Sequence, residues 1–177
     1  IDSETNLAII LKKNEITFPD TTFQKLIAHN AIGIVPKLTY PYNRNYTAGG
    51  ESALLDGKKG GNNFRDGNWQ GYWASDAEVI IDLGESKPIN HLNTGFIQYN
   101  NAWIFFPDSV EYSTSLDGKV YKKMRTVVNT MDKKEKGQII QDFQLAVSYS
   151  DARYIKMKAY NIGKCPEWHD AAGSDTW

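Results

Sequence analysis

The sequence predicts an all-β fold, an antiparallel sandwich or barrel, and two observations support this. Short runs with many β-branched and aromatic residues, or with strict alternation of polar and apolar residues, recur along the chain and are separated by turn residues. No segment shows a helical period for more than one or two turns. The length of 177 residues suits one domain with its own core.

The predicted strands follow one another from the end of the first thirty residues to the end of the chain. In the segment 109–115, Val110, Tyr112 and Thr114 share one face, and Asp117-Gly118 then predicts a hairpin turn. Short helical turns are expected at 23–30 and 52–55. The first strand contains a proline, which favours an edge or an end. The predicted strands are 31–39, 79–83, 89–98, 109–115, 120–128, 139–145 and 153–160.

Residues 1–27 differ from the rest of the chain. An apolar run at 7–11 is followed by a polar turn at 12–15 and by a second short run at 16–18. This segment is either an N-terminal hairpin or the remnant of a preceding domain, and the sandwich is expected to span residues 28–177.

Charge and cysteine content exclude several classes of function. The net charge is −1, which argues against nucleic-acid binding, because nucleic-acid-binding domains carry a basic excess. The single cysteine permits no intrachain disulfide and no cysteine-rich metal site. No apolar run approaches the length of a membrane span.

The stretch DGKKGGNNFRDGNWQGYWASD, residues 56–76, has large aromatic side chains among Gly, Asn and Asp. Loops of a sandwich gather at its two ends, so aromatic residues from distant loops can line one surface. An aromatic ring stacks on the C–H face of a sugar, and polar side chains bind its hydroxyls. The alternative is that these rings plug the ends of the core, above all Trp103. The candidate sugar-binding residues are Trp69, Tyr72, Asn100, Trp103, Trp168 and His169.

The same stretch suggests a cation. Asp56 and Asp66 each precede a glycine, and Asn62 lies between them. Calcium takes six to eight oxygen ligands from carboxylates, amides and carbonyls. The alternative is a pair of Asp-Gly turns without a metal.

No catalytic set is visible. The three histidines form no motif with a nucleophile, and no phosphate-binding or zinc motif is present. Carboxylate pairs that converge only in the fold remain open, with Asp66, Asp76 and Asp170 as loose candidates. The chain is therefore expected to be non-catalytic.

The order of several motifs resembles the factor V/VIII type C (discoidin-like) domain. The motifs are Leu-Asp-Gly at 55–57, Ile-Asp-Leu-Gly at 81–84, Ser-x-Asp-Gly at 115–118 and Ala-Arg-Tyr-Ile at 152–155. Within that family the chain is similar to family 32 carbohydrate-binding modules. The stretches GNWQGYWASD, NNAWIFFP and NIGKCPEWHDAAG look closest to the C-terminal module of bacterial family 20 β-N-acetylhexosaminidases.

This resemblance implies a jelly-roll β-sandwich of about eight antiparallel strands and a non-catalytic module of an exported glycoside hydrolase. It implies as partners the parent catalytic domain and glycans with terminal galactose or N-acetylhexosamine sugars, and a structural Ca²⁺ near Asp56. The final strand of such modules, which often completes the ion site, is expected to be missing after Trp177. Arg153 is either a binding residue or part of a structural ion pair. The alternative function is a module that packs against its parent enzyme without binding glycans.

Overall fold

The computed structural model describes residues 4–13 and 16–177, with side chains from Ile27 onward, and it confirms the all-β class. One antiparallel sheet of five strands has the order β3-β4-β7-β5-β6, and β1 and β2 pair separately. Two single-turn 3-10 helices lie in loops. The strands are β1 (Glu4–Lys13), β2 (Ile16–Ile27), β3 (Lys37–Leu38), β4 (Ala77–Gln98), β5 (Ser109–Ser115), β6 (Lys122–Val128) and β7 (Ile139–Tyr160), and the helices are η1 (Ala53–Leu55) and η2 (Asn100–Ala102).

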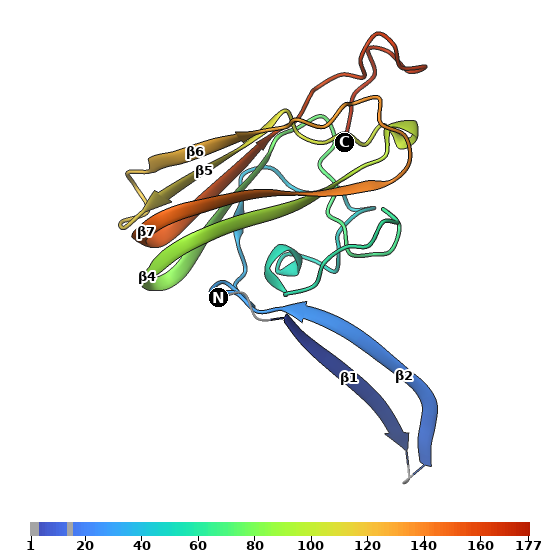
Figure 1. Ribbon diagram of the computed structural model, residues 1–177, viewed down its shortest axis with the longest axis vertical. Coiled ribbons are helices and arrows are strands. Elements are labelled where there is room, and N and C mark those ends of the chain that lie inside the picture. Colours follow the sequence, from blue (N-terminus) through green and yellow to red (C-terminus); the bar gives the residue numbers. More distant parts are fainter. Residues whose placement is uncertain (1–3, 14–15) are drawn as a thin grey trace.

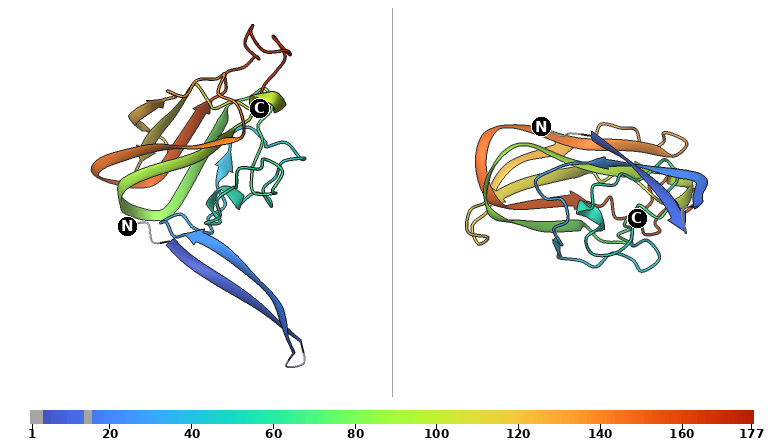
Figure 2. Two further views of the ribbon diagram at one scale, coloured as in Figure 1. Left: turned by 45° about the vertical axis from the view of Figure 1, so that its right-hand side comes forward. Right: turned by 90° about the horizontal axis from the view of Figure 1, so that it is seen from below.

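Two long strands turn this sheet into a two-layer sandwich. β4 and β7 pair along their whole length, and their register shifts between Asp82 and Lys87 and again between Ile89 and His91. Irregularities of this kind bend a strand and increase its twist. Both strands therefore fold over, and each contributes to both layers of the sandwich (Figures 1 and 2).

The core lies between these layers. Phe143 on β7 is fully buried, and its ring centroid lies 5.2 Å from that of Phe96 and 6.2 Å from that of Phe106. The Tyr112 hydroxyl on β5 crosses between the layers and donates a 2.8 Å hydrogen bond to the Phe143 carbonyl. Burial raises the pKa of Tyr112 to about 12. The layers are thus joined by aromatic packing and by one buried hydrogen bond.

Local sequence patterns predicted most strands correctly. Each of the two long strands, β4 and β7, was predicted as two separate shorter strands. The strand predicted at 109–115 is confirmed as β5, and the side chains of Val110, Tyr112 and Thr114 are buried. The runs 79–83 and 89–98 are two parts of β4, since Gly84 lies at the bend rather than at an end. The runs 139–145 and 153–160 are likewise joined in β7.

Three further predictions concern the first third of the domain. The strand at 31–39 is reduced to the two residues of β3, because a turn occupies 30–33. The helical turn at 52–55 is confirmed as η1. The helical turn at 23–30 is wrong, since the backbone up to Ile27 continues β2 in its pairing with β1.

The first two strands form an antiparallel hairpin that projects away from the sandwich (Figure 1). Its last residue, Ile27, donates a 2.8 Å backbone hydrogen bond to Gly57. The turn predicted at 12–15 falls partly on residues 14–15, which lie outside the described residues. The division of the chain at residue 27 stays a prediction. Within the described ranges, no helix is long and apolar enough to cross a membrane.

Candidate functional site

Three loop segments that are distant in sequence meet at one end of the sandwich. They are the long loop between β3 and β4, the η2 segment, and the tail after β7, beside the C-terminus in Figure 1. Ala74 donates a backbone hydrogen bond of 2.9 Å to Thr176, and Trp177 donates one of 3.0 Å to Trp103. Thr176 is fully buried, which anchors the tail. These bonds bring aromatic residues of all three segments together.

Six aromatic rings form a continuous chain at this end, which we call the aromatic chain. Each ring contacts the next, with centroid separations between 4.8 and 6.3 Å. Contacts at such separations, mostly tilted or edge-to-face, are the favourable geometries for aromatic pairs. In order of contact the rings are Tyr99, Phe64, Tyr46, Trp177, Trp73 and Trp103.

The far end of the aromatic chain faces solvent. Trp73 keeps 37% of its surface exposed and Trp103 keeps 42%. Trp103 also adopts a left-handed backbone with φ 61°, as do Ala74 at 54° and Ala48 at 53°. These are the three non-glycine residues with positive φ in the described part of the chain, and all belong to this end. Such strain clusters at functional sites, which favours this end as the site.

An open cavity of about 490 Å³ adjoins the aromatic chain, and we call it the loop pocket. Tyr46 and Phe64 belong to both features, so the pocket and the chain are contiguous. Ligand sites typically have volumes of about 300 to 1,000 Å³ and combine aromatic walls with a few polar groups. The lining residues are Asn45, Tyr46, Thr47, Ala48, Phe64, Arg65, Gly67 and Trp69.

The Trp69 ring is fixed in the pocket wall by its neighbours. Its indole nitrogen donates a 2.9 Å hydrogen bond to the Gly61 carbonyl. A Cβ added at Gly60 would collide with the indole, so only glycine allows this close approach. Trp69 therefore offers a rigid surface.

Tyr72 lies elsewhere. Its ring packs against the core, and its hydroxyl donates a 3.1 Å hydrogen bond to Gln70. Burial, together with the nearby Tyr42, raises the pKa of Tyr72 to about 12. The side chain is therefore part of the support beneath the site.

Asn100 and His169 hold loops together. The Asn100 amide donates to the carbonyls of Lys133 and Glu135, both at 3.2 Å. The His169 Nδ1 accepts from the Ala171 amide at 3.0 Å, so Nε2 carries the proton and donates to the Asn100 carbonyl at 2.8 Å. Both ring nitrogens are thus engaged.

Trp168 belongs to a second, smaller aromatic cluster. Its ring lies 6.3 Å from Phe105 and 5.7 Å from His169, and the Lys134 ammonium lies 5.7 Å above it. Trp168 is 41% exposed. No ring contact joins this cluster to the aromatic chain among the described residues. Trp69 thus lines the loop pocket, Trp103 ends the aromatic chain, and Trp168 and His169 lie in the separate second cluster. The role of each in sugar binding stays a prediction.

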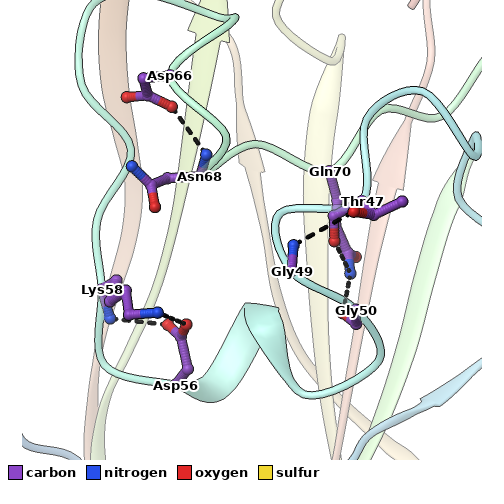
Figure 3. Close-up of polar contacts among 8 residues, drawn as sticks. All are labelled: Thr47, Gly49, Gly50, Asp56, Lys58, Asp66, Asn68 and Gln70. Atoms are coloured by element: carbon purple, nitrogen blue, oxygen red, sulfur yellow. Dashed lines mark hydrogen bonds and ion pairs between the residues drawn. The ribbon is translucent and has the colours of Figure 1, made fainter.

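The predicted calcium ligands are engaged separately (Figure 3). One Asp56 oxygen accepts a 2.8 Å bond from the Lys58 amide, and the other lies 3.1 Å from the Lys58 ammonium. Asp66 accepts hydrogen bonds from the backbone amides of Gly61 and Asn68. Asn62 is exposed. As the loop stands, these residues do not form one ligand set, and the described residues contain no cluster of three acidic, His or Cys side chains for a metal. Calcium binding stays a prediction.

Arg153 makes a structural ion pair at the bend of β4 and β7. Its Nε donates to one Asp82 oxygen at 2.8 Å and its Nη2 donates to the other at 3.0 Å. This two-pronged geometry suits the guanidinium fork. Of the two alternatives left open by the sequence, the ion pair is present.

Five rings of the aromatic chain are absent from the candidate list drawn from the sequence, and two of them, Tyr46 and Phe64, also line the loop pocket. The Tyr46 ring contacts both Phe64 and Trp177, and the Phe64 ring also contacts Tyr99. A signal was present for Phe64, which lies within the aromatic stretch 56–76. Tyr46 lies upstream of that stretch, and the bridge between Thr47 and Gln70 and the hydrogen bonds around it bring it there.

Comparison with known proteins agrees with this architecture. The F5/8 type C domain family matches residues 38–173. No curated protein is similar enough in sequence to be matched. A variant of chitosan-binding module 1 from a chitosanase/glucanase of Paenibacillus sp. IK-5 is similar in structure, with 16% identity, a TM-score of 0.50 and coverage of 84% of this chain and 92% of that one.

Two family 32 modules of Clostridium perfringens are also similar. One, in complex with GalNAc-β-1,3-galactose, has 14% identity and a TM-score of 0.46 over 80% of this chain and 88% of its own. The other, from NanJ in complex with galactose, has 13% identity and a TM-score of 0.44 over 81% and 88%. Since the family match covers most of the sequence and the observed sandwich agrees with it, the chain belongs to the F5/8 type C domain family.

Proposed function

We propose that the chain is a non-catalytic carbohydrate-binding module that binds terminal sugars at the loop pocket and the exposed end of the aromatic chain. The observation that carries this proposal is the continuous series of rings beside a cavity of about 490 Å³. A pyranose ring presents a flat face of C–H groups to an aromatic side chain, and its hydroxyls bind polar groups at the rim. The pocket supplies both kinds of surface.

Polar groups of the pocket remain free for such hydroxyls. Thr47 accepts a 3.3 Å hydrogen bond from Gly49 through its side-chain oxygen, which leaves the hydroxyl proton to donate. Gln70 donates to the carbonyls of Thr47 and Gly50 and so fixes this wall (Figure 3). The side-chain amide of Asn45 has no hydrogen-bond partner among the described residues, whereas its backbone N–H donates to Asn43. A sugar therefore meets preorganised walls, which lowers the entropy lost on binding.

The pocket lacks the carboxylate, imidazole and thiol groups that most often act as acid, base or nucleophile. Its lining contains no Asp, Glu, His or Cys side chain. The pKa values of Asp82 and Asp117 are lowered by hydrogen bonds to their carboxylates, whereas a general acid needs a raised pKa. This supports binding without catalysis.

The parent protein is proposed to be an exported glycoside hydrolase, with a β-N-acetylhexosaminidase as the specific candidate. The similar module from Paenibacillus is a chitosan-binding module of a chitosanase/glucanase. A module of this kind holds its enzyme near a glycan outside the cell. Terminal galactose and N-acetylhexosamine sugars are the proposed ligand classes.

A packing module is the second candidate, and one observation favours it. Large apolar residues are exposed at the β5–β6 turn and in the bend of β7, namely Leu116 at 64%, Val120 at 75% and Tyr149 at 80%. These two segments lie at the end of the sandwich opposite η2 (Figure 1). A neighbouring domain that covers this end would leave the loop pocket open.

A glycan array followed by titration calorimetry tests the first candidate. We expect a Kd of about 0.1 to 1 mM, since one stacked ring and a few hydrogen bonds contribute only about −4 to −5.5 kcal/mol. Trp103→Ala should weaken binding by about fivefold or more, because it removes an exposed ring face. Tyr149→Ala is the control, since it removes an aromatic ring that is even more exposed, at the other end of the sandwich, and should leave the affinity unchanged.

Two results would contradict the proposal. One is a blank array from protein whose circular dichroism shows a folded sandwich, which would favour the packing module. The other is a loss of binding in Tyr149→Ala that equals the loss in Trp103→Ala.

A further inference from the structure

The loop pocket has one charged side chain, and that side chain is a cation. Arg65 is exposed, and the other lining residues are neutral at pH 7. Neither Arg44, next to the lining residue Asn45 in sequence, nor Asp66, between Arg65 and Gly67, belongs to the lining. The one charge among the lining residues is therefore positive, although the whole chain carries a net charge of −1.

The Arg65 side chain contacts the ring of its neighbour Phe64. Its guanidinium lies 5.0 Å from the centre of the Phe64 ring, within the range of a cation–π contact. Its backbone amide donates a 3.0 Å hydrogen bond to the Asn63 side chain. The Phe64 amide donates a 3.1 Å bond to Gln138, which ties this segment to the loop before β7. The hydrogen bonds therefore fix the backbone of this segment, and the ring contact places the guanidinium over Phe64.

No carboxylate neutralises this guanidinium. Within the part of the chain that the structure describes, Arg65 makes no ion pair, whereas Lys58, Lys59, Lys133 and Arg153 each have an acidic partner. The adjacent carboxylate, Asp66, accepts hydrogen bonds from the amides of Gly61 and Asn68 instead. The donors of Arg65 thus remain available.

We propose that the loop pocket prefers sugars that carry an anionic group, a carboxylate or a sulfate, and that Arg65 recognises that group. The inference rests on the proposed function and narrows its ligand class. A guanidinium presents parallel N–H donors that match two oxygens of such an anion. The sugar ring then lies against the aromatic wall formed by Tyr46, Phe64 and Trp69.

Calorimetry with matched neutral and anionic sugars tests this preference. The probes are the methyl glycosides of galactose and glucose, the corresponding uronic acids and the corresponding sulfated sugars. We expect an anionic sugar to bind about tenfold more tightly than its neutral counterpart at low salt. Preference for the uronic acid alone identifies a carboxylate as the ligand group, and equal preference for the sulfated sugar identifies a general anion site. The preference should shrink at high salt, because exposed charges are screened.

Two substitutions locate the effect. Arg65→Ala should remove the difference in affinity between the anionic and the neutral sugar, and Arg65→Lys should retain part of that difference, since the charge stays while the fork is lost. Arg125→Ala is the control, because Arg125 is an exposed arginine on β6 and also makes no ion pair with a described residue. The melting temperature of each variant shows that it is folded.

The outcomes separate this inference from the proposed function. Equal affinity of the wild-type protein for neutral and anionic sugars would overturn the anion preference and leave the binding module intact. A preference that survives Arg65→Ala would overturn the role of Arg65. A folded protein that binds none of the probes would overturn the proposed function and this inference with it.

Discussion

At the scale of single residues, the ion pair between Asp82 and Arg153 makes the stability of the fold depend on pH. The hydrogen bonds from Arg153 and from the Gly84 amide lower the pKa of Asp82 from 3.8 to about 2. Because the folded-state pKa lies below the ordinary value, the stabilisation is complete above about pH 4 and is lost as the pH falls through about 2. Asp82→Asn should therefore lower the melting temperature at pH 7, and this difference from the wild type should shrink between pH 4 and 2.

Thermal melts by circular dichroism at several pH values measure this difference. Asp151→Asn is the control. Asp151 lies two residues before Arg153 on β7, is exposed and makes no ion pair with a described residue. A difference between Asp82→Asn and wild type that stays constant down to pH 2 would show that the ion pair does not stabilise the fold.

At the scale of elements, the turn between β5 and β6 depends on Gly118. This residue has φ +70°, and a Cβ there would lie 3.1 Å from the Tyr154 ring. The Ser115 hydroxyl accepts from the Gly118 amide, and the Asp117 carboxylate accepts from the amides of Lys119 and Val120. Gly118→Ala should lower the free energy of unfolding by about 1 to 2 kcal/mol from the left-handed conformation alone, and by more because of the ring.

Gly137 provides the comparison for this turn. It has φ +92°, and a Cβ there would meet no atom within 4 Å. Urea unfolding of Gly137→Ala therefore measures the conformational cost without a clash. Equal losses in the two variants would mean that the Tyr154 ring moves aside at no cost.

The same elements show what local sequence determines. Alternation and turn chemistry sufficed for β5 and for the turn at Asp117-Gly118, since both depend on near neighbours. The continuity of β4 through Gly84 was not predictable from local pattern, because Gly84 looks like an end until the pairing with β7 is known. The site has the same limit, since the contacts of Tyr46 with Phe64 and Trp177 arise only in the fold.

At the scale of the whole molecule, the core between the bent strands provides stability, and the loops at one end of the sandwich form the candidate site. The layers are joined through Phe143 and Tyr112 in the core, so the loop end is free to hold strained and exposed residues such as Trp103. Resemblance to a known family predicted this sandwich, while the individual site residues depended on long-range contacts. Sequence reasoning therefore placed Trp69 and Trp103 among the candidates together with Tyr72, which supports the site from within the core.

Calcium binding, if it occurs at the loop of Asp56, changes the stability of the whole molecule. An ion that binds only the folded state raises the free energy of unfolding by an amount that depends on its concentration relative to Kd. At about 100 times Kd the gain is about 2.7 kcal/mol, or about 5 to 10 °C in melting temperature for a domain of this size. We expect CaCl₂ to raise the melting temperature by this order relative to EDTA, and Asp56→Asn to remove the shift.

Lys58 makes this prediction sharper. Its ammonium lies 3.1 Å from Asp56, so a calcium ion must displace it to reach that carboxylate. Lys58→Ala should therefore increase the calcium-dependent shift, since the competing cation is gone and the carboxylate charge is left unbalanced. The Lys59→Ala variant is the control, because Lys59 pairs with Asp142 instead. If the melting temperature of Lys58→Ala is the same in CaCl₂ and in EDTA, the loop does not bind calcium, and the lysine is itself the cation that balances Asp56.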